Sequence, residues 1–538
     1  MDDLTAEIIA ATDKRRTFAI ISHPDAGKTT LTEKLLLFGG AIRLAGEVKG
    51  RKAKKFATSD WMEIEKQRGI SVTSSAMQFE FSGYKINILD TPGHQDFSED
   101  TYRTLAAADS AVMIIDAARG VEAQTIKLFQ VCRQRQIPIF TFINKMDRYG
   151  KEPLDLLQEL EDVLGIRSCP MNWPVGMGEE FRGIFDRRKN RFELYVGDDH
   201  DHTQRQFIPL VRQQEEERDF DHDQLSQYID KHQYNRFVSD MELLDIAGDP
   251  FDEEQVRQGL LTPVFFGSAI NKFGVQTFLD EFIALAPKPQ AHMSDQGPVE
   301  VTAPFSGFIF KIQANMNPAH HDRIAFLRVC SGKFARGMLV NHVRSAKKIK
   351  LAQPQQFLSQ ERTIVQEGFP GDIIGLYDQG TLFIGDTLSL AGDFQFAPLP
   401  QFAPEIFAQV VNLNTSKYKQ FLKGIHELVQ EGVVQLFTMF NRTEDLLLGA
   451  VGQLQFEVFA YRMQNEYGAS IRLEPLKYQL ARWVHNLAPD HMEQLTSLSS
   501  LLVQDRHGQS VVLCENEYNL HWLEGKYPEL TFAASNYK

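Results

Sequence analysis

The chain has 538 residues, of which 43% are hydrophobic and 24% charged, a composition typical of a globular protein with about three domains. Its longest apolar runs, such as residues 112–115, are far too short to span a bilayer, and residues 1–5 lack the start of a secretory signal. Its four cysteines are widely spaced, which argues against a disulfide framework or a zinc site. We therefore expect a cytoplasmic protein with no membrane partner.

The net charge of −14 is unevenly distributed along the chain. Residues 190–260 contain 18 acidic and 7 basic side chains, a balance of −11, which leaves −3 for the other 467 residues. A basic run precedes this acidic segment and consists of Arg43, Lys49, Arg51, Lys52, Lys54 and Lys55. The overall acidity therefore does not exclude a nucleic-acid partner at one face, although a solvated surface explains each run equally well.

The first 150 residues alternate strand and helix patterns, as a doubly wound α/β domain does. Continuous apolar runs are typical of parallel strands covered on both faces. They predict strands at 17–21, 86–89, 111–116, 137–143 and 263–266, with helices at about 29–38 and 275–285.

Three domains are predicted. The interval of 120 residues between Asp147 and Ser268 is too long for one connection, so we expect an inserted subdomain at about 167–260. A proline-rich linker at 286–298 ends the first domain, 1–290. Short β-rich runs with frequent glycines predict a β-barrel over 299–400, and mixed periods after the prolines near residue 400 predict an α+β domain over 402–538.

A phosphate-binding loop is predicted between the first strand and the first helix. It differs from the usual pattern in having serine in place of the first glycine, and it comprises Ser22, His23, Pro24, Asp25, Ala26, Gly27, Lys28, Thr29 and Thr30. Its backbone N–H groups and the helix N-terminus suit phosphate oxygens. Lys28 would neutralise the β- and γ-phosphates, while the Thr29 hydroxyl would ligate Mg²⁺.

A second loop follows the strand at 86–89 and contains Asp90, Thr91, Pro92, Gly93 and His94. Asp90 would hold Mg²⁺ through water, and the Gly93 N–H would contact the γ-phosphate. Because that contact requires a triphosphate, the loop is a natural switch.

Two further motifs predict a guanine pocket. Asn144, Lys145, Met146 and Asp147 end one buried strand, and Ser268 and Ala269 follow another. The Asp147 carboxylate would accept from N1–H and the 2-amino group of guanine, donors that adenine does not present together, and a backbone N–H of the second motif would reach the guanine oxygen. Four motifs in this order, each at a strand end, predict a P-loop protein that binds GTP or GDP with Mg²⁺.

The chain then resembles the translational GTPases, since residues 68–72 are similar to the first switch of that group and residues 90–94 to its second. More narrowly, residues 22–30, 68–75, 310–316 and 451–458 resemble the bacterial peptide chain release factor 3 family over nearly the whole chain. Residues 167–260 are similar in placement to the extra subdomain of the related elongation factor G.

This resemblance implies roles for individual residues. His94 would position the attacking water, and Ser71, where elongation factors usually have threonine, would join Thr29 and Asp90 as a Mg²⁺ ligand. Asp25 would help hold a monovalent cation. Proline at position 24 replaces the usual valine opposite Ile70, which leaves a gating role for that pair open.

The resemblance also implies partners and a function. The partners would be the GTPase-associated region of the large ribosomal subunit, ribosomal RNA and the class-I release factors, with no DNA partner and a monomer off the ribosome. A GTP-bound form would drive departure of the class-I factor after peptide release, and hydrolysis would then let the protein leave. The alternatives are a translocation factor, disfavoured because the chain stops one domain after the barrel, and a ribosome-bound scaffold, disfavoured by intact Lys28, Asp90 and His94.

Overall fold

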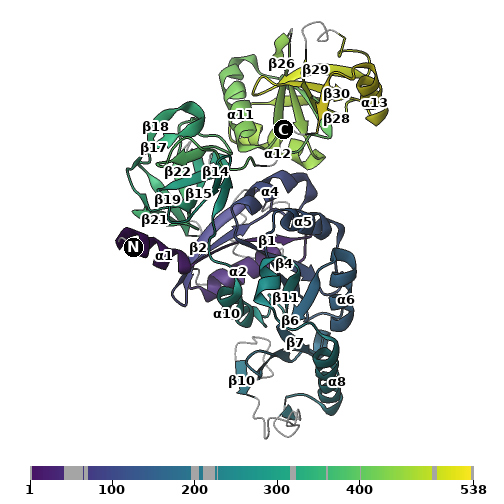
Figure 1. Cartoon of the computed structure of the whole chain (residues 1–538). Helices are drawn as coiled ribbons and strands as arrows, with labels where there is room; N and C mark the ends of the chain where they lie inside the picture. The colour runs from purple at the N-terminus through teal and green to yellow at the C-terminus, as the bar shows by residue number, and fades with distance from the viewer. Residues whose placement is uncertain are drawn as a thin grey trace.

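The computed structural model has an α/β domain with an insertion, followed by a curled β-barrel-like sheet and an α+β domain, as the sequence predicts (Figure 1). It describes residues 3–41, 65, 71–195, 205–209, 225–226, 228–314, 323–358, 361–399, 401–440, 442–487 and 494–534. Among these residues, no helix is both long and apolar enough to cross a membrane.

The first domain is built on a seven-stranded sheet in the order β2-β3-β1-β4-β5-β11-β6. Its strands are β1 (Arg15–Ser22), β2 (Ser75–Phe81), β3 (Tyr84–Asp90), β4 (Ser110–Asp116), β5 (Ile139–Asn144), β6 (Arg167–Pro170) and β11 (Leu261–Phe266). All neighbouring pairs are parallel except β2 and β3. Ser82 and Gly83 both have positive φ angles, 50° and 78°, as a two-residue hairpin turn between these antiparallel strands requires.

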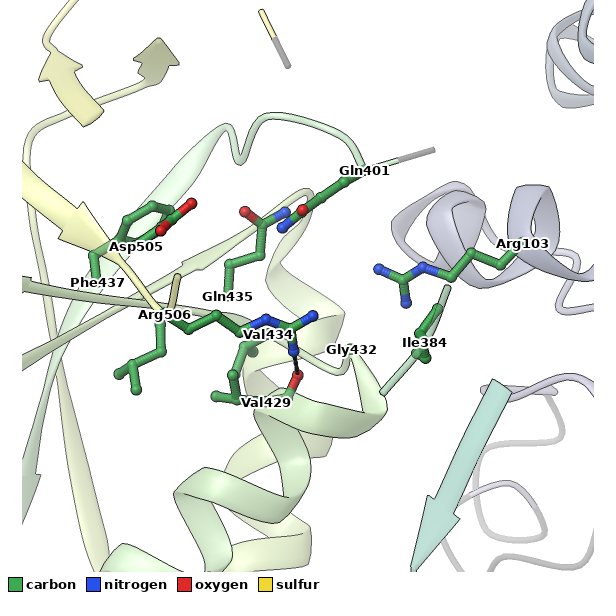
Figure 2. Close-up of a pocket in the computed structure, with 11 residues that line it drawn as sticks. Arg103, Ile384, Gln401, Val429, Gly432, Val434, Gln435, Phe437, Asp505 and Arg506 are labelled. Carbon is green, nitrogen blue, oxygen red and sulfur yellow. Dashed lines mark hydrogen bonds between the residues drawn. The ribbon is translucent and has the colours of Figure 1, made fainter. Parts of the chain in front are cut away.

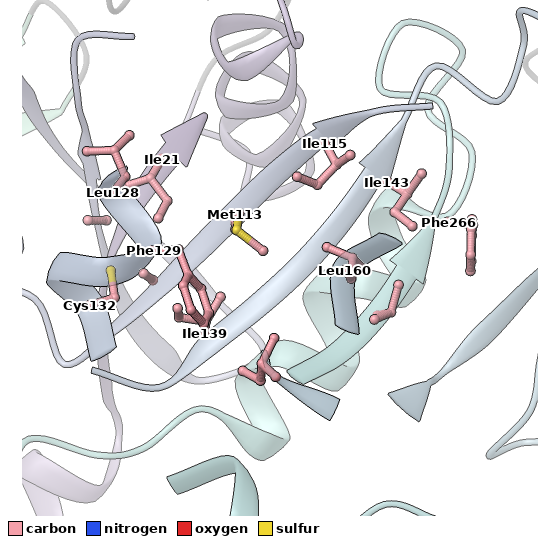
Figure 3. Packing of buried hydrophobic residues seen from close by; sticks show 14 of the residues in the cluster. Ile21, Met113, Ile115, Leu128, Phe129, Cys132, Ile139, Ile143, Leu160 and Phe266 are labelled. Carbon is pink, nitrogen blue, oxygen red and sulfur yellow. The ribbon is translucent and has the colours of Figure 1, made fainter. Parts of the chain in front are cut away.

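Helices cover both faces of this sheet because successive residues in each strand point to opposite sides. One face packs on α4 (Ser98–Ala106), α5 (Ala123–Gln134) and α6 (Pro153–Leu164). Figure 3 shows the packing on this face, where the residues drawn include Ile21, Met113, Ile115, Leu128, Phe129, Cys132, Ile139, Ile143, Leu160 and Phe266. The other face packs on α2 (Lys28–Phe38) and α10 (Val275–Leu285). A preceding helix, α1 (Asp3–Asp13), leads into β1.

The predicted buried strands and both predicted helices are confirmed, with ends within a few residues of the expected ones. All four cysteines are free and buried, so they form no disulfide. Burial raises the pKa of the Cys132 thiol to about 12, and it raises the pKa of Cys169 to about 11. These thiols are therefore packing groups and not reactive ones.

A second, smaller sheet follows the edge strand β6 at one end of the first domain. Its four antiparallel strands are β7 (Asn172–Val175), β8 (Gly183–Asp186), β9 (Arg191–Tyr195) and β10 (Arg205–Pro209). Two helices, α8 (Lys231–Ala247) and α9 (Glu253–Arg257), follow this sheet in the chain and precede β11. The Trp173 indole is fully buried and donates to Asp240 of α8 at 3.1 Å, which fixes this helix on the small sheet. Within the acidic segment, residues 196–204, 210–224 and 227 lie outside the described residues.

A β-ribbon, β12 (His292–Ser294) with β13 (Gly297–Val299), leads from α10 to the second domain. The sheet of that domain has the order β18-β17-β23-β14-β15-β22-β19-β20. Its strands are β14 (Ser306–Ala314), β15 (Arg323–Ser331), β17 (Leu339–His342), β18 (Lys347–Lys350), β19 (Pro354–Leu358), β20 (Glu361–Ile364), β22 (Ile373–Tyr377) and β23 (Thr387–Ser389), beside a two-stranded pair of β16 (Phe334–Ala335) and β21 (Glu367–Gly368).

The C-terminal domain combines helices with an eight-stranded antiparallel sheet of order β27-β24-β26-β25-β29-β30-β28-β31. Its helices are α11 (Tyr418–Glu431), α12 (Gln453–Asn465) and α13 (Glu517–Lys526). Its strands are β24 (Ile406–Asn412), β25 (Gln435–Met439), β26 (Arg442–Ala450), β27 (Ile471–Pro475), β28 (Leu480–His485), β29 (Ser500–Asp505), β30 (Ser510–Cys514) and β31 (Thr531–Ala533).

Buried polar contacts hold the second domain against the first. The Gly371 carbonyl accepts from the Thr17 hydroxyl at 2.7 Å and from the Asn87 amide at 3.1 Å. The Arg328 guanidinium, which is fully buried, pairs with Asp109 at 2.6 Å. Because an ion pair buried in this way is costly to open, the first two domains form a firm unit.

Candidate nucleotide-binding site

The loop between β1 and α2 has the backbone shape that an anion cradle requires. Asp25 and Gly27 have positive φ angles, 66° and 99°, and the helix begins immediately afterwards at Lys28. A Cβ on Gly27 would overlap the Asn144 amide, so a side chain is excluded there by space as well as by backbone conformation. Such a turn followed by a helix N-terminus directs backbone N–H groups at a bound anion.

The second predicted loop packs directly on the first. Lys28 donates to Asp90 Oδ1 at 2.7 Å, and both side chains are buried, with 7% and 2% exposed. The Thr91 hydroxyl donates to the Ile20 carbonyl at 2.6 Å. A Cβ on Gly93 would lie 3.4 Å from the Pro24 backbone, so the two loops lie close together. Lys28, which is predicted to neutralise phosphate, thus contacts Asp90, a predicted metal ligand.

His94 begins a short 3₁₀ helix, η1 (Gln95–Phe97), directly after this loop. Its Nδ1 accepts from the Asp96 N–H at 3.3 Å and lies 3.3 Å from the Asp96 carboxylate oxygen Oδ1. The imidazole remains 38% exposed, while the Asp96 side chain is 9% exposed. A neutral ring whose Nδ1 accepts this bond carries its proton on Nε2.

Asn144 joins three of the predicted motifs. Its side chain is buried, and its Nδ2 donates to the Ala26 carbonyl at 2.9 Å while its Oδ1 accepts from the Ala269 N–H at 2.9 Å. Lys145, with a φ angle of 71°, extends across the first loop and donates to the Asp25 carbonyl at 2.6 Å. One strand end therefore fixes the positions of two neighbouring loops.

The residues predicted to select guanine also lie together. The Ser268 hydroxyl donates to Asp147 Oδ1 at 2.5 Å, and this bond sets the orientation of the carboxylate. Ser268 and Ala269 are buried, whereas Asp147 is partly exposed. Met146 is buried behind them, and its N–H donates to the Gly267 carbonyl at 3.1 Å. The Asp147 carboxylate is therefore held in a fixed orientation beside Ser268.

The predicted metal ligands suit Mg²⁺ chemically. Thr29, Ser71 and Asp90 offer two hydroxyls and one carboxylate, the hard oxygen donors that Mg²⁺ prefers beside phosphate and water ligands. Asp90 is buried next to Lys28, and Thr29 follows Lys28 in the first turn of α2. Ser71 is partly buried and directly precedes Val72, whose N–H donates to Glu65 at 2.9 Å.

Some predictions lie outside the described residues. These are the basic run at 43–55 and the positions 68–70, which include Ile70 of the proposed pair with Pro24. His23 was predicted as part of the first loop. Its imidazole lies 3.2 Å from Glu122 and is partly exposed, so its backbone is the part that we assign to phosphate binding.

Sequence reasoning did not identify Asp116, whose Oδ2 accepts from Lys145 Nζ at 2.6 Å. Asp116 ends the buried strand β4 in the same way that Asp90 ends β3, and that signal could have found it. Asp96 was not predicted either, because its contacts arise from tertiary structure.

Lys311 belongs to one of the motifs behind the resemblance. It is buried, donates to the Ser74 carbonyl and lies 3.8 Å from Asp100.

These loops define the class of protein to which the chain belongs, a P-loop protein whose strand-end loops are joined to one another by hydrogen bonds. Family models agree and divide the chain in the same order. Residues 13–288 match the Elongation factor Tu GTP binding domain, residues 304–391 match Elongation factor G domain 2, and residues 396–524 match the C-terminal domain of Class II release factor RF3. The chain is a translational GTPase.

Curated relatives narrow this class. The chain is 55% identical to Peptide chain release factor 3 of Symbiobacterium thermophilum over 99% of both chains. It is 56% identical to that of Listeria innocua over 98% of both, and 54% identical to that of Streptococcus mutans over 96% of this chain and 97% of the relative. The chain belongs to the peptide chain release factor 3 family, and the translocation-factor alternative is not favoured.

A solved structure agrees with the fold. The chain superposes on a crystal structure of a Thermus thermophilus protein with a TM-score of 0.68 and 22% identity, over 93% of this chain and 72% of that one.

Proposed function

We propose that the chain is a GTP-driven termination factor that acts on the ribosome after peptide release. In its GTP-bound form it would bind the GTPase-associated region of the large subunit, contact ribosomal RNA there and promote dissociation of a class-I release factor. Hydrolysis would then let the chain itself leave. The support is the full-length similarity to proteins named peptide chain release factor 3, together with a C-terminal segment of the release-factor type.

The observation that carries the GTP dependence is the bridge at Asn144. Its two hydrogen bonds tie the phosphate loop at Ala26 to the guanine loop at Ala269, and the second loop packs on Pro24 beside them. Recognition of the base and of the third phosphate is therefore performed by one connected structure. A ligand can shift a switch only by binding its two states with different affinities, and a contact to the γ-phosphate at Gly93 provides that difference.

In this proposal the residues divide into three groups by the part of the nucleotide they serve. The first and second loops contact phosphate through Ser22, His23, Pro24, Asp25, Ala26, Gly27, Lys28, Thr29, Thr30, Thr91, Pro92 and Gly93. The base is held by Asn144, Lys145, Met146, Asp147, Ser268 and Ala269. Thr29, Ser71 and Asp90 would hold Mg²⁺, which when bound neutralises charge on the transferring phosphate.

His94 is the proposed catalytic residue. Phosphoryl transfer needs orientation of water and stabilisation of charge more than covalent chemistry from the protein. The imidazole is held by Asp96, is partly exposed and follows the γ-phosphate loop directly, which suits positioning of an attacking water. The ribosome would order this segment, as an activating partner does elsewhere with a rate effect of about 10³–10⁵-fold.

We also propose that the three domains span about 1–290, 299–400 and 402–538, with the insertion at about 167–260, and that the chain is a cytoplasmic monomer off the ribosome. The family models end and begin near these boundaries, at 288, 304, 391 and 396, which supports the division.

The test is a dissociation assay on ribosomes stalled at a stop codon after peptide release, with a fluorescent class-I release factor bound. The chain with GTP should accelerate departure of the fluorescent factor, and GDP should not. A non-hydrolysable GTP analogue should release the class-I factor but retain the chain on the ribosome. Lys28→Ala is the matched control, since it removes the phosphate cation. An unchanged departure rate with GTP contradicts the proposal.

A further inference from the structure

Two charged side chains that follow the γ-phosphate loop contact the ends of helices in the C-terminal domain. The Asp96 carboxylate lies at the N-terminus of α12, where its Oδ2 accepts from the Leu454 N–H at 2.9 Å. The Arg103 guanidinium of α4 approaches the turn at Gly432, which ends α11 (Figure 2). A carboxylate at a helix N-terminus and a cation at a C-terminus both match the helix dipole.

The contact at α12 is tightly fitted. A Cβ on Gly452, the residue that caps this helix, would overlap the Asp96 carboxylate. Gly452 has a φ angle of −150°, which any residue adopts, so space and not backbone conformation excludes a side chain here. The neighbouring Phe97 packs with Val72 and Val458 in a buried apolar cluster. The 3₁₀ helix after His94 is thus joined to α12 by a hydrogen bond and by apolar packing.

Asp96 is also the residue that holds His94. One carboxylate oxygen, Oδ1, lies 3.3 Å from His94 Nδ1, while the other, Oδ2, accepts from Leu454. The Asp96 N–H donates to the same ring nitrogen at 3.3 Å. A displacement of α12 relative to this segment therefore acts, through the Asp96 side chain, on the residue whose N–H orients the imidazole.

We propose that Asp96 is a positioning residue that couples the placement of the C-terminal domain to the orientation of His94. This inference rests on the proposed role of His94 in hydrolysis. With α12 seated on Asp96, the residue whose backbone N–H holds the imidazole is fixed in place. When the C-terminal domain moves, Asp96 loses the Leu454 N–H and the imidazole loses its fixed neighbour. The rate of GTP hydrolysis thereby depends on the position of the C-terminal domain.

The most selective perturbation is Gly452→Ala, because it changes the C-terminal domain alone and leaves every side chain of the nucleotide site intact. The added methyl group displaces the Asp96 carboxylate. We expect kcat for ribosome-stimulated GTP hydrolysis to fall by about 10–100-fold, the effect of misplacing a catalytic group by about 1 Å. The KM for ribosomes and the Kd for GTP should change less than about threefold, since the added methyl group meets Asp96 and no nucleotide loop is altered.

Gly525→Ala is the matched control. Gly525 lies in α13 of the same domain, and a Cβ there meets nothing within 4 Å. This variant should retain the parent kcat and melting temperature. Equal kcat values for Gly452→Ala and Gly525→Ala would overturn the proposal.

Variants of Asp96 supply a second measurement. Asp96→Ala should lower kcat as Gly452→Ala does, and Asp96→Asn should restore most of the rate because its amide oxygen still accepts from Leu454. The double variant Asp96→Ala, Gly452→Ala should be no slower than either single variant, as expected for changes that act through one contact. Fully additive losses would contradict the coupling.

His94→Ala separates this inference from the proposed function. If His94→Ala turns over GTP normally on the ribosome, the catalytic role of His94 is wrong and the coupling falls with it. If His94→Ala is slow and Gly452→Ala is normal, the coupling alone is wrong. If Gly452→Ala does not fold, the pair Asp96→Asn and Asp96→Ala decides by the presence or absence of rescue.

Discussion

Replacing Asn144 with alanine tests how far one buried side chain organises the nucleotide site. The substitution removes the donor to the Ala26 carbonyl and the acceptor for the Ala269 N–H, each bond 2.9 Å long in the structure. Both backbone groups belong to buried residues. The variant therefore leaves one carbonyl and one N–H without their partner at the junction of the phosphate and guanine loops.

The expected size of the effect follows from those two groups. A buried polar group left without its partner costs about 1–3 kcal/mol, so two cost roughly 2–6 kcal/mol if the loops keep their present arrangement. Water entering the space recovers part of this. A remaining loss of about 2 kcal/mol corresponds to about 30-fold weaker nucleotide binding.

Calorimetric titration of GDP into the parent chain and the variant measures this change in Kd. Asn87→Ala is the control, since Asn87 is also buried but donates to Thr17 and Gly371 at the interface with the second domain. The control should lower the melting temperature without weakening GDP binding. A Kd for Asn144→Ala within about threefold of the parent value would refute the bridging role.

Further predictions concern charge at the site and at the domain interface. Lys28→Ala should abolish tight nucleotide binding, and retained sub-micromolar affinity in the same titration would refute the cradle assignment. Asp147→Asn should shift preference from guanosine toward xanthosine nucleotides in competition binding; an unchanged preference would overturn the base-pocket assignment. Burial alone raises the pKa of the Asp372 carboxyl, but Lys85 and Arg15 outweigh it and leave the pKa below its usual value. The stabilisation from Asp372 is therefore present above the unfolded-state pKa of ~3.9 and lost as pH falls through the lower folded-state pKa. Asp372→Asn should flatten the acid limb of melting temperature against pH, and equal slopes would contradict this.

The strand ends and loops of the candidate site could be predicted from the sequence, because phosphate and guanine chemistry require particular residue types at strand ends. The strands that end at Asp90 and Asn144 were recognisable as continuous apolar runs, and the motifs that follow them are short and local. The helix α10 was predicted at about its observed bounds, and the proline-rich linker predicted at 286–298 follows it. Local patterns were sufficient for all of these features.

The contacts between domains were not predicted, because they pair residues hundreds of positions apart and have no local pattern. Asp96 and Leu454 are 358 residues apart in the chain, and Arg328 and Asp109 are 219 apart. A charged residue in a loop looks the same in the sequence whether it is solvated or caps a distant helix. Gly452 likewise gives no sign of its role, since its constraint is the carboxylate that packs against it.

We propose that strand-end loops joined by Asn144 form a pocket that selects a guanine nucleotide. Direct titration of the purified chain with GDP and with ADP under identical conditions tests it. We expect GDP to bind up to about 10⁴-fold more tightly than ADP, because ADP leaves the Asp147 carboxylate without its two donors. Equal affinity for the two nucleotides would contradict the assignment of the pocket and the ribosomal function built on it.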